Sequence, residues 1–165
     1  MSEPESDLKR MMKTVPQVGR VEQILLRRVR KGQVEAVQTA SVVMRHGLEG
    51  DRFRGRSERP KRQVTAIQAE HLPVIAALSG RTSVDPADLR RNLVISGIPL
   101  VAMKDRRFRI GEHCVLEWTA PCDPCHRMEA LLGAGGFNAM RGMGGVCCRV
   151  VAPGEIRVGD PVVAV

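Results

Sequence analysis

Apolar and polar residues alternate along much of this chain, which is the spacing of β-strands that are half buried in a sheet. The alternation begins near Gly19 and predicts a first strand there, a second over residues 34–44, and a hairpin turn between them at Gly32. Strand character returns in five later segments: 62–68, 93–96, 107–119, 146–151 and 155–165. We expect the segment 107–119 to bend or to form a hairpin at Gly111. So many short strands favour an all-β barrel or a compact, mostly-β domain.

Helical spacing is confined to short stretches. Residues 69–78 are apolar at helical spacing and end at Gly80, and residues 126–132 predict a short helix that Gly133 closes. Asp85 stands before a proline and is a suitable N-cap for a further helical turn.

Two segments show no regular pattern. Residues 46–61 contain three glycines, one proline and many charges, which predicts a long loop. Residues 1–18 are polar and lack periodicity, so we expect a flexible N-terminal tail followed by one domain over residues 19–165.

Composition narrows the possible partners. The chain has three Phe, one Trp and no Tyr, so its core must be aliphatic. Its net charge of +8 favours an anionic partner: nucleic acid, a phosphate-bearing ligand or an acidic membrane surface. No apolar run reaches the ~18–20 residues of a membrane helix, and the polar N-terminus does not resemble a signal peptide. We therefore expect a cytoplasmic protein with no membrane partner and with reduced cysteines.

Arginine is concentrated in three clusters, at residues 52–62, 90–91 and 106–109. Arginine suits bidentate recognition of phosphate, although a cluster of charge can also be a solvated face. Single-stranded nucleic acid is usually bound through stacked aromatic side chains, and the few aromatics here are scattered. A small phosphorylated ligand fits the sequence better than nucleic acid.

The segment 121–126, PCDPCH, has several possible chemistries. Cys-x-x-Cys-His is a haem attachment signal, but covalent attachment usually occurs outside the cytosol. A zinc site would need Cys147 and Cys148 as its second half, and their adjacent spacing is poor. A thioredoxin-like pair would need a βαβ unit. The remaining interpretations are a reactive thiolate in a cationic pocket or a cysteine buried as a small apolar residue.

The other candidate ligands are isolated. Cys147 and Cys148 are neighbours on a predicted strand, so they should point to opposite faces and at most one can face a given site. We expect Cys114 to lie in the core. Among the histidines, only His126 stays a candidate, because it adjoins the cysteine pair.

Six short motifs together resemble a known family. They are Gly50-Asp51-Arg52, Arg62-Gln63-Val64-Thr65, Arg90-Arg91-Asn92-Leu93-Val94, Pro121-x-x-Pro124-Cys125, Arg141-Gly142-x-Gly144-Gly145-Val146 and Gly154-x-Ile156-x-Val158-Gly159-Asp160. In this order they resemble the MOSC domain, named for the C-terminal domain of molybdenum cofactor sulfurase. The resemblance runs from about residue 19 to the C-terminus.

This resemblance implies a mostly-β fold: a MOSC-type β-barrel with a few short helices. It implies binding of the molybdenum cofactor, a pterin with dithiolene sulfurs and a phosphorylated tail. The family cysteine that ligates molybdenum or carries sulfur falls on Cys125. Arg90 and Asn92 match cofactor-contacting positions of the mitochondrial amidoxime-reducing component. Cofactor binding is likewise implied for four further motif residues: Arg52, Arg62, Gln63 and Arg141.

The resemblance also implies a function. We expect a molybdoenzyme that reduces N-hydroxylated compounds with electrons from a partner reductase. The alternative is a carrier of cofactor or sulfur, with a persulfide on Cys125, a sulfur-bearing substrate and a cofactor biosynthesis protein as its partner. A basic nucleic-acid-binding module is the alternative from another class. We expect no pyridoxal phosphate site, because such a site would lie in an aminotransferase-like domain that this sequence lacks.

Overall fold

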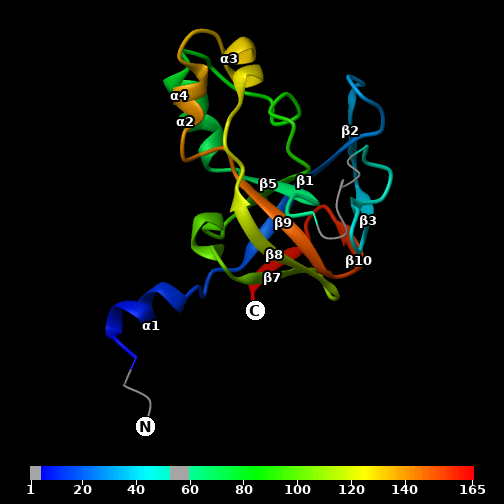
Figure 1. Cartoon of the computed structure of the whole chain (residues 1–165), viewed down its shortest axis with the longest axis vertical. Helices are drawn as coiled ribbons and strands as arrows, with labels where there is room; N and C mark the ends of the chain where they lie inside the picture. The colour runs from blue at the N-terminus through cyan, green and yellow to red at the C-terminus, as the bar shows by residue number, and fades with distance from the viewer. Residues whose placement is uncertain (1–4, 53–59) are drawn as a thin grey trace.

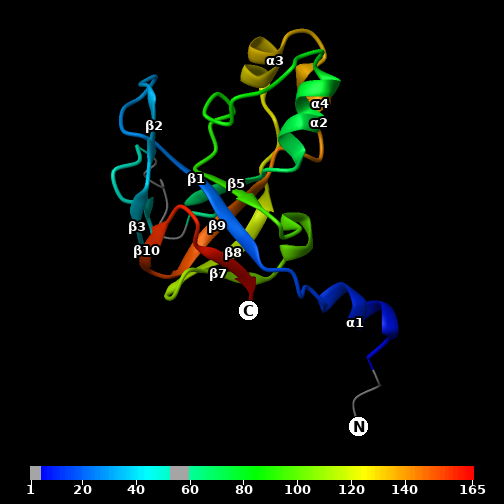
Figure 2. The same cartoon turned by 180° about the vertical axis from the view of Figure 1, so that it is seen from behind.

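Seven strands close into a barrel in the computed structural model, which describes residues 5–52 and 60–165 (Figures 1 and 2). In their order around the barrel they are β11 (Pro161–Ala164), β7 (Arg107–Ile110), β8 (Cys114–Pro121), β9 (Val146–Ala152), β5 (Val64–Gln68), β6 (Leu93–Ser96) and β1 (Gly19–Arg27). The pairing of Gly19 with Val162 closes the ring. The prediction of a mostly-β barrel with a few short helices is confirmed.

Strands outside the ring extend it on one side. β2 (Val34–Val37) pairs with β1, and a separate small sheet contains β10 (Gly154–Arg157), β3 (Thr39–Val43) and β4 (Gly47–Leu48). The hairpins predicted at Gly32 and Gly111 are both present, because β1–β2 and β7–β8 pair antiparallel.

Two predicted strands are each divided in the structure. The segment 34–44 divides at Gln38. Its first part, β2, pairs with β1, whereas its second part, β3, pairs with β10. The segment 155–165 divides at Gly159, whose φ of 96° turns the chain between β10 and β11. Each division lets the chain pass from the barrel to the small sheet or back, and no local periodicity records such a change.

The helices are short, and three of them gather at one end of the barrel (Figure 1). These three are α2 (His71–Leu78), α3 (His126–Leu132) and α4 (Gly136–Met140), and α4 lies in a segment for which no helix was predicted. A 3-10 helix, η1, covers Leu100–Met103. The predicted turn at Asp85 forms, with its carboxylate accepting from the Ala87 N–H at 2.9 Å, but it does not extend into a helix.

Two apolar cores hold these layers together. The larger fills the barrel, and Phe108 is the only aromatic residue among the buried residues described. The smaller joins the three helices to the outside of the barrel, with Ile67 and Val94 packing against Ile75, Met128 and other apolar residues. The core is therefore aliphatic, as the composition predicts.

Helix α1 (Asp7–Lys13) projects from the barrel, and none of its residues is buried (Figures 1 and 2). It occupies part of the segment predicted to be a flexible tail. Among the described helices, none is long and apolar enough to cross a membrane.

Candidate functional site

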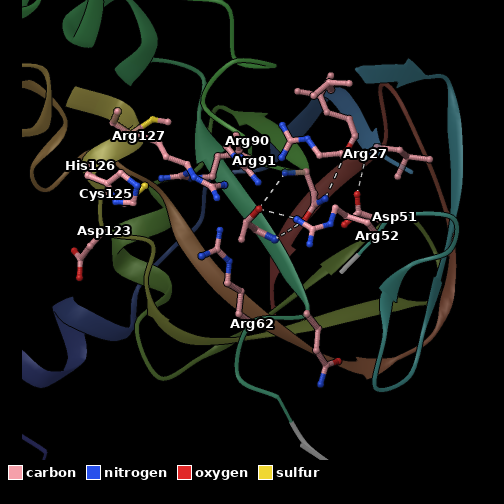
Figure 3. Close-up of a pocket in the computed structure, with 17 residues that line it drawn as sticks. Arg27, Asp51, Arg52, Arg62, Arg90, Arg91, Asp123, Cys125, His126 and Arg127 are labelled. Atoms are coloured by element: carbon pink, nitrogen blue, oxygen red, sulfur yellow. Dashed lines mark hydrogen bonds between the residues drawn. The ribbon is translucent and has the colours of Figure 1, made fainter. Parts of the chain in front are cut away.

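A cavity of about 860 Å³ opens where strands β5 and β6 begin and β1 ends. β5 and β6 are parallel, so their starts lie at the same edge of the barrel. The chain before each start brings its arginines to this edge, and the loop before α3 forms another wall (Figure 3). Six arginines and two aspartates line the cavity: Arg27, Arg52, Arg62, Arg90, Arg91, Arg127, Asp51 and Asp123.

Six of the seven residues predicted from the sequence line this one cavity. They are Arg52, Arg62, Gln63, Arg90, Asn92 and Cys125. The seventh, Arg141, follows helix α4, is exposed, and is not among the lining residues. The structure thus brings together motifs that are up to 73 residues apart in sequence, from Arg52 to Cys125.

Cys125 places an exposed thiol at one side of the cavity. It is the N-cap residue of α3, with extended backbone, and its carbonyl accepts from the Met128 N–H at 2.8 Å. Asp123, Cys125, His126 and Arg127 lie together on this side, and Arg27 lies on the opposite side (Figure 3). A ligand in the cavity could therefore contact the thiol at one end and guanidinium groups along its length.

Four arginines lie close enough to repel one another. Burial lowers the pKa of Arg90, and the charges of Arg27, Arg127 and Arg52 lower it further, while Cys125 opposes them. Burial is also the main cause of the lowered pKa of Arg27, to which Arg52 and Arg127 again contribute. An anion bound among these four groups would relieve their mutual repulsion.

The backbone turns sharply at Arg90, which directly precedes Arg91. Arg90 has a φ of 64°, in the left-handed region that residues other than glycine rarely adopt. Arg91, only 5% exposed, donates from Nε to the carbonyl of Gly144 at 2.6 Å and from Nη2 to that of Cys122 at 3.3 Å. Its Nη1 donates to the carbonyl of Leu89. Arg91 therefore anchors the walls of the cavity through backbone contacts.

The predicted amide residues also hold the walls. Asn92 Oδ1 accepts from the Thr65 N–H at 3.0 Å and from Thr65 Oγ1 at 3.1 Å, and its Nδ2 lies 3.4 Å from the carbonyl of Leu25. Gln63 Nε2 donates to the carbonyl of Pro60 at 3.0 Å, and its Oε1 accepts from a backbone N–H of β9 at 3.0 Å. These contacts make both amides positioning residues.

Sequence reasoning did not assign three of the lining arginines: Arg27, Arg91 and Arg127. Arg91 belongs to a predicted cluster and Arg127 adjoins the cysteine segment, so position in the sequence could have suggested both. Arg27 ends a strand far from any motif. Its neighbour in space is Asp51, whose Oδ1 accepts from the Arg27 N–H at 2.8 Å. Only the tertiary structure brings Arg27 to the cavity.

A pair of buried thiols lies beneath the wall of the cavity. Cys122 and Cys147 are buried, and their thiols form a hydrogen bond. That bond is the main cause that lowers the pKa of Cys122 to about 6; Arg91 and Arg62 lower it further, and burial opposes them. The pKa of Cys147 is raised, first by the same bond and then by burial.

The remaining cysteines are apolar core residues. Cys148 and Cys114 both belong to the barrel core, and burial raises the pKa of each thiol. Cys148 thus faces the barrel interior while its neighbour Cys147 contacts Cys122. Within residues 5–52 and 60–165, no group of three or more His, Cys, Asp or Glu side chains could hold a metal ion.

Comparison with solved structures found the same fold in several proteins from bacteria. The YUAD protein from Bacillus subtilis is 18% identical, with a TM-score of 0.80 over 90% of this chain and 97% of that one. YiiM from Escherichia coli is 21% identical, with a TM-score of 0.66 over 88% and 69%. YiiM from Geobacillus stearothermophilus is 17% identical, with a TM-score of 0.64 over 89% and 75%.

The comparison with curated proteins gave no match. The family model of the MOSC domain matches residues 48–163, which is more than half of the chain and includes all six motifs in full. The motifs and the barrel agree with this match. The chain therefore belongs to the MOSC domain family.

Proposed function

We propose that this protein binds the molybdenum cofactor in the arginine-lined cavity, with Cys125 as the protein's ligand to the metal. The family is associated with this cofactor. The observation that carries the proposal is the presence of one exposed thiol and six arginines in a single cavity. The cofactor brings its own dithiolene sulfurs to the metal, so one additional soft donor from the protein suffices.

The arginines fit the other end of the cofactor. The group formed by Arg27, Arg52, Arg90 and Arg127 offers several planar guanidinium forks for a terminal phosphate, which would accept charge-assisted hydrogen bonds. The volume of about 860 Å³ lies within the ~300–1,000 Å³ typical of ligand sites. The donor set therefore suits both the soft metal end and the anionic tail.

Each part of the cavity has a distinct task in this proposal. Cys125 would hold the metal end of the cofactor, and the arginines would orient the pterin by its phosphate. Asn92 and Gln63 keep the walls in place through the backbone contacts described above. When bound, the cofactor would supply two-electron chemistry that converts an N-hydroxylated substrate, two electrons and two protons into the reduced amine and water. A partner reductase would supply the electrons.

Matched cysteine variants test the metal ligand. We expect Cys125→Ser to lose most of its molybdenum after expression in a molybdenum-replete host, because serine is a harder and poorer donor to this metal. Cys122→Ser should lose much less, because Cys122 is buried beneath the wall. Elemental analysis with pterin fluorescence measures both quantities. A greater loss of molybdenum from Cys122→Ser would contradict the assignment, and wild-type protein without molybdenum or pterin would refute the proposal.

The exposure of Cys125 also favours a second candidate function, sulfur transfer through a persulfide on this thiol. Intact mass spectrometry of freshly purified protein would show the additional sulfur atom on Cys125. A persulfide without molybdenum and without reduction of N-hydroxylated substrates would favour the carrier function. A nucleic-acid-binding module would instead give affinity that falls steeply with salt and does not depend on Cys125.

A further inference from the structure

Cys147 lies on β9, and Cys122 directly follows the end of the neighbouring strand β8. Neither has a part in the proposed role of Cys125. β8 and β9 pair antiparallel up to Pro121 opposite Val146. One step further, the Cys122 N–H donates to the carbonyl of Gly145 at 2.8 Å. Cys147 Sγ lies 3.9 Å from the carbonyl oxygen of Pro121 and also forms a hydrogen bond with the Cys122 thiol. Backbone pairing therefore places the two thiols beside each other.

Positive charge next to this pair favours the thiolate form of Cys122. Arg91 is buried, and its side chain donates to three neutral carbonyl oxygens, one of which belongs to Cys122. Arg62 adds a second positive charge nearby. A Cys122 thiolate would supply the negative charge that balances Arg91, because the carbonyl oxygens that accept from Arg91 carry no net charge. A thiolate beside a thiol is the arrangement from which disulfides form.

We propose that Cys122 and Cys147 are a site of reversible oxidation, at which hydrogen peroxide converts the two thiols into a disulfide. The Cys122 thiolate attacks one peroxide oxygen, the O–O bond breaks, and water leaves after protonation, so that Cys122 becomes a sulfenic acid. The Cys147 sulfur then attacks the Cys122 sulfur, the S–S bond forms, and the sulfenic oxygen leaves as a second water. Two electrons pass from the thiols to the peroxide, and a dithiol reductant reverses the reaction.

The position of the pair gives this reaction a consequence for the cavity. The disulfide would join β9 covalently to Cys122, and Cys125 follows only three residues later. It would also remove the thiolate from the neighbourhood of Arg91. The other thiols are placed differently, because Cys148 and Cys114 are in the barrel core and Cys125 is exposed.

Peptide mapping after mild oxidation tests the proposal. Cleavage after arginine gives one peptide of residues 110–127, with Cys114, Cys122 and Cys125, and another of residues 142–149, with Cys147 and Cys148. After treatment of the full chain with hydrogen peroxide, we expect two of its five free thiols to be lost. The intact mass should fall by about 2 Da, and the two peptides should be linked until a dithiol is added.

Variants locate the bond within the linked peptides. Cys125→Ser should still form the link, whereas Cys122→Ser and Cys147→Ser should not. Cys147→Val keeps an apolar side chain at this position and serves if the serine variant fails to fold. A link that persists in Cys147→Val, a disulfide between Cys122 and Cys125, or oxidation confined to Cys125 would overturn the proposal. None of these readouts requires bound cofactor, so failure here is distinct from failure of the proposed function.

Discussion

At the scale of single residues, the cavity combines charge with local strain. Arg90 adopts a left-handed backbone that costs about 1–2 kcal/mol in a residue with a Cβ. The pKa of its guanidinium is lowered, first by burial and then by the like charges of the neighbouring arginines. Both costs are typical of positions whose geometry serves binding. Arg90 is therefore the residue at which stability and ligand binding should separate most clearly.

We expect Arg90→Gly to unfold with a free energy within about 1 kcal/mol of wild type, because relief of the left-handed strain offsets the greater freedom of glycine in the unfolded chain. The same variant should retain less pterin, since one guanidinium is lost from the cavity. Denaturant unfolding and pterin fluorescence measure the two effects. Arg109→Gln removes an exposed charge on β7 and should retain pterin normally. Equal losses of pterin from Arg90→Gly and Arg109→Gln would mean that the net charge of the protein, and not the cavity, governs binding.

Arg141 gives a second prediction at this scale. It was expected to bind the cofactor because it belongs to a family motif, yet it does not line the cavity. We expect Arg141→Ala to retain molybdenum and pterin at wild-type levels. A loss comparable to that of Arg90→Gly would show that Arg141 contacts the cofactor after all.

At the scale of elements, the glycine segment before β9 determines how closely the cavity walls approach. A Cβ at Gly144 would lie 2.1 Å from the carbonyl oxygen of Cys122, which is far closer than atoms can pack. Arg91 donates to the carbonyl of Gly144 and so joins the same walls. Gly142, in contrast, has a φ of 78° but open space around its Cα. The two glycines are thus required for different reasons.

Alanine substitutions should distinguish these reasons. Gly144→Ala must push away the backbone at Cys122, and we expect it to destabilise the fold by about 2–3 kcal/mol, as overpacking does. It should also reduce molybdenum retention, because Cys125 follows that backbone. Gly142→Ala should cost about 1–2 kcal/mol through its left-handed conformation alone and should leave molybdenum retention unchanged. Thermal unfolding and elemental analysis test both variants, and identical behaviour would contradict this account.

At the scale of the whole molecule, helix α1 contributes no residue to either apolar core. Barrel closure pairs β1 with β11, which lie at opposite ends of the domain in sequence. Helix α1 precedes this closure and buries no residue. The +8 net charge is partly concentrated in the cavity, where arginines outnumber aspartates by six to two.

Removal of residues 1–14 should therefore leave the barrel intact. We expect the melting temperature and the molybdenum content to stay at wild-type values, because no contact of either core is lost. Val15 packs against the barrel core, so the truncation stops before it. Thermal unfolding monitored by circular dichroism, together with elemental analysis, checks this expectation. A lower melting temperature would show that α1 belongs to the folded domain.

The sequence by itself determined most local structure and much of the site. Strands and hairpins follow from alternation and from glycines such as Gly111, because a two-residue period and a left-handed turn are local properties. The helix 126–132 appears over the predicted residues. The order of the family motifs also predicted that Arg52, Arg90 and Cys125 act together. A family pattern groups residues by their common function, even where they are far apart in the sequence.

The tertiary structure decided which side chains are available to a ligand. Gln63 binds a backbone group 87 residues away on β9, so its amide is used within the wall. Arg27 joins the cavity only because the end of β1 lies beside the starts of β5 and β6. Cys122 lies beside Cys147 only because the end of β8 pairs with β9. Such pairings depend on burial and strand register across the whole chain, and local sequence carries no signal for either.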